Sequence, residues 1–229
     1  MEILDRRLSD IVTTIPGAPA LLRQLDIDFC SDGQLSLSQV VSSKGLDAGQ
    51  LVEALKQLQS SEQDSPVNWA EQPRTRLISH ILERYHARHR EQLPALMFLA
   101  AKVERVHARA AACPQGLTEL LRDISHELES HMMKEEQILF PMLAGGIYPN
   151  GPINVMQDEH IEHLQMINRL FSLTNNMKAP TGACNSWRTL YQNLEEFTDD
   201  LMQHITLENY FLFTPEEISE NTSCCGSCQ

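Results

Sequence analysis

Between residues 74 and 213, apolar residues recur at spacings of three and four, which is the period of an amphipathic α-helix. Turns that contain glycine or proline divide this pattern into four long segments, at about 74–111, 117–143, 153–173 and 183–213. Short connections make consecutive helices antiparallel neighbours. The sequence therefore predicts an up-down-up-down four-helix bundle over residues 74–215.

The first 60 residues predict a small, separate helical domain. Short apolar segments at 20–25, 36–41 and 46–58 have helical spacing, and Asp47 is a suitable N-cap for the third. No run shows the alternation of period two that is typical of strands, so we expect an all-α fold. The polar, proline-containing residues 61–73 predict a linker, and a cysteine-rich tail follows the bundle at 216–229.

The 229-residue chain has ordinary contents of apolar (42%) and charged (21%) residues, which predicts a packed core. Its formal net charge of −13 argues against a nucleic acid or an anionic membrane as partner, although a local basic patch around Arg84, Arg88 and Arg90 is compatible with it. We find neither a basic leader followed by apolar residues nor an apolar run long enough to cross a bilayer. We therefore expect a cytoplasmic protein.

Two ten-residue segments, 131–140 and 204–213, align without a gap. Each begins with His-x-x-x-Glu and ends with an apolar run that finishes in Leu-Phe. On a helix, positions i and i+4 lie on one face about 6 Å apart, so each segment directs an imidazole and a carboxylate to one point. A single motif of this kind is usually a surface pair. Two of them in a repeat, each before an apolar run, favour a dinuclear metal site.

The other two long segments each offer a histidine in phase with the apolar face. The separation of His86 from His131 nearly equals that of His160 from His204, so two antiparallel hairpins bring these residues level. The predicted metal ligands are His86, His131, Glu135, His160, His204 and Glu208.

Each of two metal ions would then receive two imidazole nitrogens and two oxygens from bridging carboxylates. That donor set leaves room for an oxo or hydroxo bridge and a small exogenous ligand. Imidazole and carboxylate without thiolate suit iron or manganese, and zinc also fits the ligand type. The Glu-x-x-His spacing of ferritin-like sites is not what these segments present.

We do not expect ligands among the remaining histidines. If the first long helix is continuous, His107 lies about 31 Å from His86. His107 is therefore predicted to be a cation near a helix C-terminus, or a ligand only if that helix is really two. Lys134 and Glu136 are predicted to lie on an exposed face. Four further histidines are expected to be solvated or to lie behind the ligands: His80, His89, His126 and His163.

The segments that carry these residues resemble the YtfE/ScdA family. The resemblance rests on Arg84-Tyr-His86-Ala-Arg-His89-Arg-Glu-Gln-Leu-Pro, Lys102-Val-Glu-Arg-Val-His107, His131-Met-Met-Lys-Glu-Glu-Gln-Ile-Leu-Phe-Pro141 and Asp200-Leu-Met-Gln-His204-Ile-Thr-Leu-Glu-Asn. It implies a hemerythrin-like bundle that holds two non-haem iron ions with oxo and carboxylate bridges, preceded by the family's small N-terminal helical domain. It further implies a cytoplasmic, often homodimeric protein that restores iron–sulfur clusters after nitrosative or oxidative stress by delivering iron.

The six cysteines are predicted to be thiols, and their placement departs from that family. The family typically has adjacent cysteines in its N-terminal domain, whereas this chain reads Asp28-Phe29-Cys30-Ser31, which leaves Cys30 as a single candidate thiol. The tail carries Cys224, Cys225 and Cys228, a Cys-x-x-Cys spacing that suits redox exchange or capture of a soft metal. We hypothesise that the tail substitutes for the missing N-terminal cysteine, and an unstructured tail is an equally supported interpretation.

Three functions are compatible with these patterns. The leading hypothesis is a repair protein that donates iron to damaged iron–sulfur proteins. The second is a di-iron enzyme that reduces or scavenges nitric oxide, so whether the chain is an enzyme stays open at this point. The third is a hemerythrin-like sensor of oxygen or nitric oxide, which would normally be attached to an output domain.

Overall fold

The computed structural model describes residues 2–60 and 67–215, and all regular secondary structure in these residues is helical. A single isolated β-bridge, between Arg7 and Ser36, accompanies the helices there. The all-α prediction is therefore confirmed. The cysteine-rich tail and part of the proposed linker lie outside the described residues.

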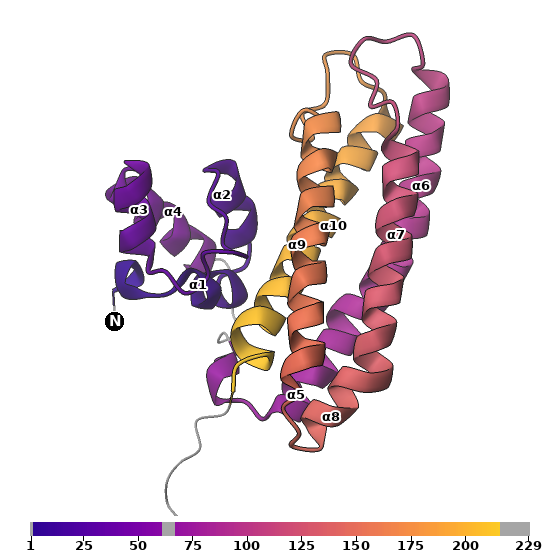
Figure 1. Cartoon of the computed structure of the whole chain (residues 1–229). Helices are drawn as coiled ribbons and strands as arrows, with labels where there is room; N and C mark the ends of the chain where they lie inside the picture. Colours follow the sequence, from indigo (N-terminus) through magenta and orange to yellow (C-terminus); the bar gives the residue numbers. More distant parts are fainter. Residues whose placement is uncertain (1, 61–66, 216–229) are drawn as a thin grey trace, which may run out of the picture.

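Four long antiparallel rods form the bundle on the right of Figure 1. The first consists of α5 (Arg74–His80), η3 (Ile81–His86) and α6 (Ala87–Val106). The second consists of α7 (Leu117–Lys134), η4 (Glu135–Leu139) and α8 (Phe140–Ala144). The third is α9 (Asn150–Leu173), and the fourth consists of α10 (Asn185–Leu207) and η5 (Glu208–Leu212). The elements η3, η4 and η5 are short π-helical turns inside otherwise α-helical rods.

The first rod ends at Val106, earlier than the predicted end near residue 111. His107 leaves the helical conformation at φ −110°, and its backbone N–H donates to the carbonyl of Val103. Successive tight turns then connect residues 107 to 113. Since Pro114 disfavours the helical conformation of the residue before it, the chain turns here and starts α7 at Leu117.

The N-terminal domain consists of η1 (Ile3–Asp5), α1 (Leu8–Thr14), α2 (Ala18–Gln24), α3 (Leu37–Lys44) and α4 (Ala48–Ser60). The short η2 (Trp69–Glu71) leads into the bundle. Asp47 caps α4 as expected, because its carboxylate accepts a 3.0 Å hydrogen bond from the N–H of Gln50. The sequence interpretation missed α1.

The N-terminal domain and the bundle share one hydrophobic core. Helices α1 and α2 lie against α10, and the buried side chains Leu8, Ile11 and Ile15 belong to the same cluster as Phe197 and Leu201. An ion pair of 3.2 Å between Arg23 and Asp199 crosses the same contact. Docking therefore buries apolar surface from both parts, which favours a fixed arrangement over two freely moving domains.

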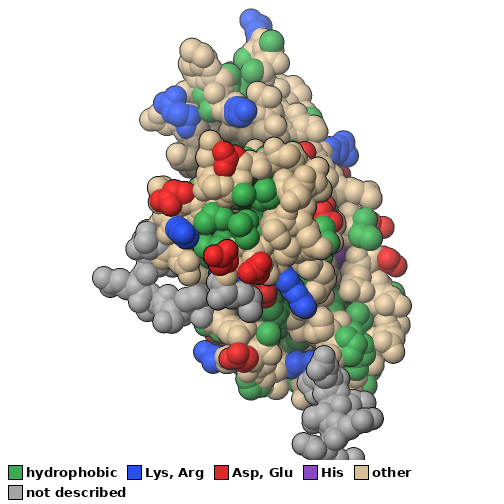
Figure 2. Space-filling view, turned by 90° about the vertical axis from the view of Figure 1, so that its left-hand side faces the viewer, with side chains coloured by type: hydrophobic (Ala, Val, Ile, Leu, Met, Phe, Trp, Pro, Cys, Tyr) green, Lys and Arg blue, Asp and Glu red, His purple; other side chains and the backbone are tan. Residues whose placement is uncertain are grey.

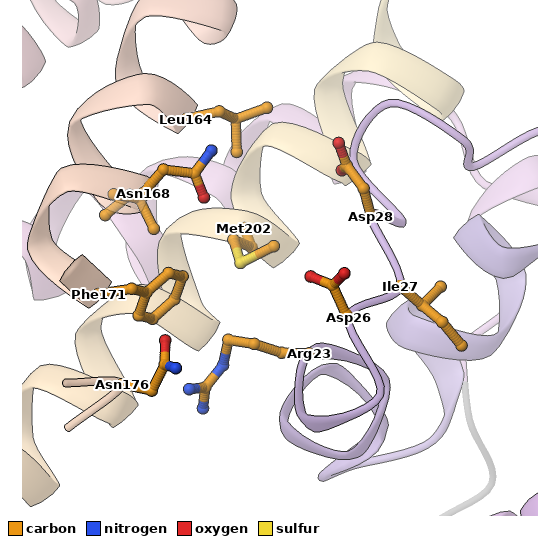
Figure 3. Close-up of a pocket in the computed structure, with 10 residues that line it drawn as sticks. Arg23, Asp26, Ile27, Asp28, Leu164, Asn168, Phe171, Asn176 and Met202 are labelled. Carbon is orange, nitrogen blue, oxygen red and sulfur yellow. The ribbon is translucent and has the colours of Figure 1, made fainter. Parts of the chain in front are cut away.

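A cavity of about 250 Å³ lies in the groove between the two parts. Figure 3 shows Arg23, Asp26 and Asp28 on one side of it and Phe171 of α9 on the other, with Met202 between them. The guanidinium carbon of Arg23 lies 5.3 Å from the centre of the Phe171 ring.

The arginines that the sequence offered as a basic patch are all paired with acidic residues. Arg84 bonds to Asp200 at 2.6 Å, and Arg88 bonds to Glu196 at 2.5 Å. Arg90 binds Glu129 and Glu136. On the face shown in Figure 2, acidic and basic side chains are interspersed with apolar ones. These arginines therefore do not form an unpaired cationic surface.

A second hydrophobic cluster closes the end of the bundle formed by α5 and α8. Among its members are Tyr85, Phe140 and Phe213, which belong to three different rods. Of the predicted ligands, His86 lies in sequence between Tyr85 of this cluster and Leu93 of the larger core. Among the described residues, none of the helices combines the length and hydropathy that crossing a bilayer would need.

Candidate metal centre

All six predicted ligands lie inside the bundle in one polar layer. They come from all four rods, and each side chain is at most 2% exposed. The layer separates the two hydrophobic clusters, so no solvent competes for these donors. Its members are His86, His131, Glu135, His160, His204 and Glu208.

The four imidazoles form two pairs, and their Nε2 atoms point inward. The Nε2 atoms of His86 and His204 are 3.2 Å apart, and those of His131 and His160 are 3.1 Å apart. Each pair therefore joins a histidine of the first hairpin with a histidine of the second.

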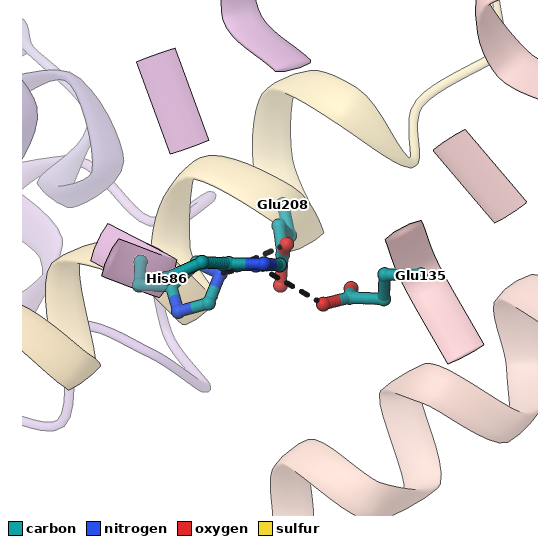
Figure 4. Close-up of side chains that lie close together, drawn as sticks. His86, Glu135 and Glu208 are labelled. Carbon is teal, nitrogen blue, oxygen red and sulfur yellow. Dashed lines mark hydrogen bonds and ion pairs between the residues drawn. The ribbon is translucent and has the colours of Figure 1, made fainter. Parts of the chain in front are cut away.

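The two carboxylates lie between these pairs. Glu135 places Oε2 3.4 Å from His86 Nε2 and Oε1 3.5 Å from His131 Nε2. Glu208 places Oε1 3.0 Å from His204 Nε2 and Oε2 3.0 Å from His160 Nε2. Figure 4 shows His86, Glu135 and Glu208 converging on one point. Each carboxylate thus gives one oxygen to each pair, which is the arrangement of a bridging ligand.

These spacings fit two groups of four donors, one around each of two ions. Metal–nitrogen and metal–oxygen bonds in such sites are about 2.0–2.2 Å long, so neighbouring donors on one ion lie roughly 3.0–3.5 Å apart. The donor atoms of each group lie within 4.8 Å of one another. Nitrogen and oxygen donors without thiolate are typical of iron, manganese or zinc.

The hydrogen bonding of the two glutamates also fits a bound cation. Both carboxylate oxygens of Glu135 are buried and have no hydrogen-bond partner among the described residues. Burial, together with the neighbouring charge of Glu208, raises the pKa of Glu135 well above its usual value. Burial acts on Glu208 in the same direction, but His204 and His160 outweigh it and hold the pKa of Glu208 low. A buried carboxylate that lacks protein donors is costly unless a cation compensates it.

The π-helical turns mark the same layer. His86 is the last residue of η3, whereas Glu135 and Glu208 are the first residues of η4 and η5. Each His-x-x-x-Glu pair thus keeps normal α-helical spacing, and the wider turn follows it. Such single π-turns within α-helices are frequent at functional sites.

Three imidazoles have a hydrogen-bond acceptor behind them. The Nδ1–H groups of His86 and His131 donate to Glu136 at 2.7 Å and Glu159 at 2.9 Å. That of His160 donates to Asn209 at 2.9 Å. Such partners fix the orientation and tautomer of a metal-binding imidazole. The prediction that Glu136 lies on an exposed face is wrong, because its carboxylate turns in toward His86.

Sequence reasoning missed Glu159 and Asn209, although a signal for Asn209 was present. In the aligned repeat, Asn209 occupies the position that Glu136 has in the first copy. Each of the two follows the glutamate of its His-x-x-x-Glu motif and accepts a hydrogen bond from a histidine on another rod.

The other histidines divide into buried and peripheral ones. His89 lies beside His204 with ring centres 5.4 Å apart, and His163 lies beside His131 at 4.9 Å. Both are buried, so they are not solvated but lie behind the predicted ligands. Burial and the neighbouring His160 lower the pKa of His163 to about 3.

His107, His80 and His126 lie outside the layer. His107 caps the C-terminal end of α6, and its Nε2 lies 3.2 Å from the sulfur of Cys184. His80 is half-buried against Trp69, whereas His126 is exposed. None of the three belongs to a group of candidate metal ligands in the described part of the chain.

Cys30 is buried where the N-terminal domain meets α10. Its sulfur lies 3.4 Å from the carbonyl oxygen of Met202 and 3.7 Å from Thr206 Oγ1. Burial raises the pKa of the Cys30 thiol. A thiol role for Cys30 stays a prediction, and in this packing the sulfur has neither the exposure nor the thiolate character of a nucleophile.

An antiparallel four-helix bundle with a buried histidine–carboxylate layer defines the class of hemerythrin-like cation-binding proteins. Residues 77–214 match the family described as the hemerythrin HHE cation-binding domain, and residues 4–59 match a domain family named ScdA_N, described as of unknown function.

The relatives narrow this assignment. The chain is 43% identical over 215 residues to the iron–sulfur cluster repair protein YtfE of Edwardsiella ictaluri, and 44% identical over the same length to the YtfE proteins of Pectobacterium atrosepticum and Escherichia coli O157:H7. Each alignment covers 93% of this chain and 97% of the relative. The chain therefore belongs to the hemerythrin HHE family and, within it, to the group of the YtfE iron–sulfur cluster repair proteins.

Proposed function

We propose that this protein holds two non-haem iron ions in the His–Glu layer and repairs damaged iron–sulfur clusters by donating iron. The observation that carries the proposal is the division of each carboxylate between two pairs of imidazoles. The names of the relatives supply the client class, which is iron–sulfur proteins. The cytoplasmic location and the homodimer implied by the family resemblance stay predictions.

The layer combines tight enclosure with a means of release. Burial, followed by the charge of His204, lowers the pKa of His86 to about 4, and burial together with His160 also lowers the pKa of His131, so these two imidazoles are neutral at neutral pH. Neutral Nε2 atoms can bind a cation without first losing a proton. Because Glu135 and Glu208 each face both pairs, protonation or rotation of one carboxylate weakens the hold on both ions together.

Metal analysis of the purified chain tests the ligand assignment. We expect about two iron ions per chain after anaerobic reconstitution, and a loss of most of this iron in Glu135→Ala and Glu208→Ala. Glu162→Ala is the matched control, because Glu162 is an exposed residue of α9 two positions after a proposed ligand. Two retained ions in both glutamate variants, with helical content unchanged, would refute shared carboxylate bridging.

The repair activity requires a separate measurement. The iron-loaded chain should restore the absorption and activity of a cluster protein whose cluster has lost iron, and the Glu135→Ala variant should not. No transfer from a fully loaded chain would exclude iron donation.

Nitric oxide reduction is the second candidate, and the donor count favours it. Four protein donors per ion leave coordination positions for small ligands on an ion that prefers six. Two nitric oxide molecules, two electrons and two protons would give nitrous oxide and water. Formation of nitrous oxide by the reduced protein, in the absence of iron transfer, would favour this function over donation.

A further inference from the structure

The two hairpins of the bundle supply the same positions to the layer, but the residues behind the imidazoles differ. His86 and His131 belong to the first hairpin, and His160 and His204 occupy the equivalent positions in the second. Every imidazole turns Nε2 to the centre, so its Nδ1 faces outward and determines which support it receives.

One pair has an acceptor behind both of its rings. His131 donates from Nδ1 to the carboxylate of Glu159, and His160 donates to the amide oxygen of Asn209. Glu159 also forms an ion pair with Lys134, which holds the carboxylate in place. Both imidazoles of this pair are therefore fixed in the orientation that a cation needs.

The other pair has an acceptor behind one ring only. His86 donates to Glu136, but the Nδ1 of His204 is buried and has no hydrogen-bond partner in the described protein. The rings of Tyr85 and His89 lie against His204, with centres 5.4 Å away in each case, and the Tyr85 ring is nearly parallel to it at 7°. The Nε2 of His89 also has no hydrogen-bond partner there, so it does not bond to the Nδ1 of His204.

The difference has a simple origin in the sequence. Glu159 is the residue before His160 and reaches the imidazole of the preceding rod. Tyr85 is the residue before His86, and it contacts His204 of the last rod. Equivalent positions therefore hold a carboxylate in one hairpin and a phenol ring in the other, and the Tyr85 hydroxyl is turned away to Gln203.

We propose that the two cation positions are unequal, that the cation between His86 and His204 is the weaker-held one, and that it is the one the protein gives up. Tyr85 and Glu159 are the positioning residues that set this order. The inference rests on the proposed function, since it names which half of the centre supplies iron. It also predicts that a chain that has donated once keeps the ion between His131 and His160.

The size of the effect follows from the missing contact. Loss of one outer hydrogen-bond partner typically lowers metal affinity about 10- to 100-fold. At one ferrous ion per chain, a tenfold difference between independent positions gives occupancies of about three-quarters and one-quarter. A larger difference makes the distribution more uneven.

Anomalous X-ray scattering from crystals of the full chain, prepared anaerobically with one equivalent of Fe(II), measures these occupancies directly. We expect the stronger signal between His131 and His160. Equal signals, or a stronger signal between His86 and His204, would overturn the inference while leaving the proposed function intact. Absence of iron from both positions even at excess Fe(II) would instead refute the proposed function.

Two variants test the cause. Glu159→Gln weakens the acceptor behind His131 and should bring the two occupancies closer together. Tyr85→Glu places a carboxylate beside His204. It should also bring the two occupancies closer together, by strengthening binding between His86 and His204. Glu162→Gln, an exposed change on α9, should leave the ratio as in the wild type. An unchanged ratio in both test variants, with iron still bound, would show that these residues do not set the order.

Discussion

Gly33 and Tyr210 join the N-terminal domain to the π-turn that begins with Glu208. The Tyr210 hydroxyl accepts a 3.0 Å hydrogen bond from the N–H of Gly33 and donates to the carbonyl of Cys30 at 2.7 Å or of Ser31 at 2.8 Å. A Cβ atom on Gly33 would lie only 2.2 Å from the nearest ring carbon of Tyr210. Gly33→Ala therefore cannot be accommodated unless the ring or the loop moves.

The expected cost combines two contributions. Overpacking costs about 1–3 kcal/mol, and each hydrogen bond lost with the displaced hydroxyl costs about 1 kcal/mol. A total of about 3 kcal/mol shifts the docking equilibrium of this loop roughly 100-fold toward the open form. Because Cys30 is buried by the docked loop, its thiol should become alkylated roughly 100-fold faster when the loop opens and closes quickly compared with alkylation.

Iodoacetamide labelling, followed by mass spectrometry of the Cys30 peptide, measures this rate. Tyr210→Phe removes the hydroxyl and its two hydrogen bonds without a clash and should give a smaller increase, of about 30-fold. Gly151→Ala is the control, since a Cβ there meets no atom within 4 Å. A Cys30 labelling rate in Gly33→Ala equal to that of the control, with native helical content, would refute the proposed link between loop and bundle.

Three further predictions concern stability. The pKa of His86 falls from 6.5 to about 4 on folding, so protonation of this group favours the unfolded chain. The metal-free protein should therefore have the full stability from this group above pH 6.5 and lose about 3 kcal/mol as the pH falls to 4. Urea unfolding at several pH values measures this loss. Phe197→Ala empties a fully buried site in the shared core and should lower the free energy of unfolding by about 3–5 kcal/mol in the same assay. Removal of metal by a chelator should lower the midpoint of thermal unfolding, because the ions bind only the folded chain; an unchanged midpoint would contradict a metal site that spans all four rods.

The clustering of the six predicted ligands could be foreseen from sequence, because helical periodicity fixes the His-x-x-x-Glu spacing and the matching reach of the two hairpins brings the other two histidines level. His131 and Glu135 share a face in any regular helix, and the second copy of the motif repeats that constraint. The rods themselves have strong apolar stripes and clear turns, so the all-α bundle was predictable. The family resemblance is confirmed by relatives that align over nearly the whole chain.

The remaining features depend on contacts between distant residues. Glu136 and Glu159 look like surface glutamates in the sequence, and only the packing of neighbouring rods turns them toward imidazoles. The π-turns cannot be recognised because their residues also fit an α-helix. In contrast, α1 could have been predicted from the sequence, since Leu8, Ile11 and Ile15 have helical spacing.

Each imidazole pair takes one ring from either half of the bundle, and this has a consequence for how such a centre can arise. One hairpin with a single histidine on its first helix and His-x-x-x-Glu on its second holds only three of the six donors. Two copies of it, related by a twofold axis, would reproduce the complete set. In a single chain that joins two such copies, each side can change alone, and the different residues at Tyr85 and Glu159 are a change of that kind.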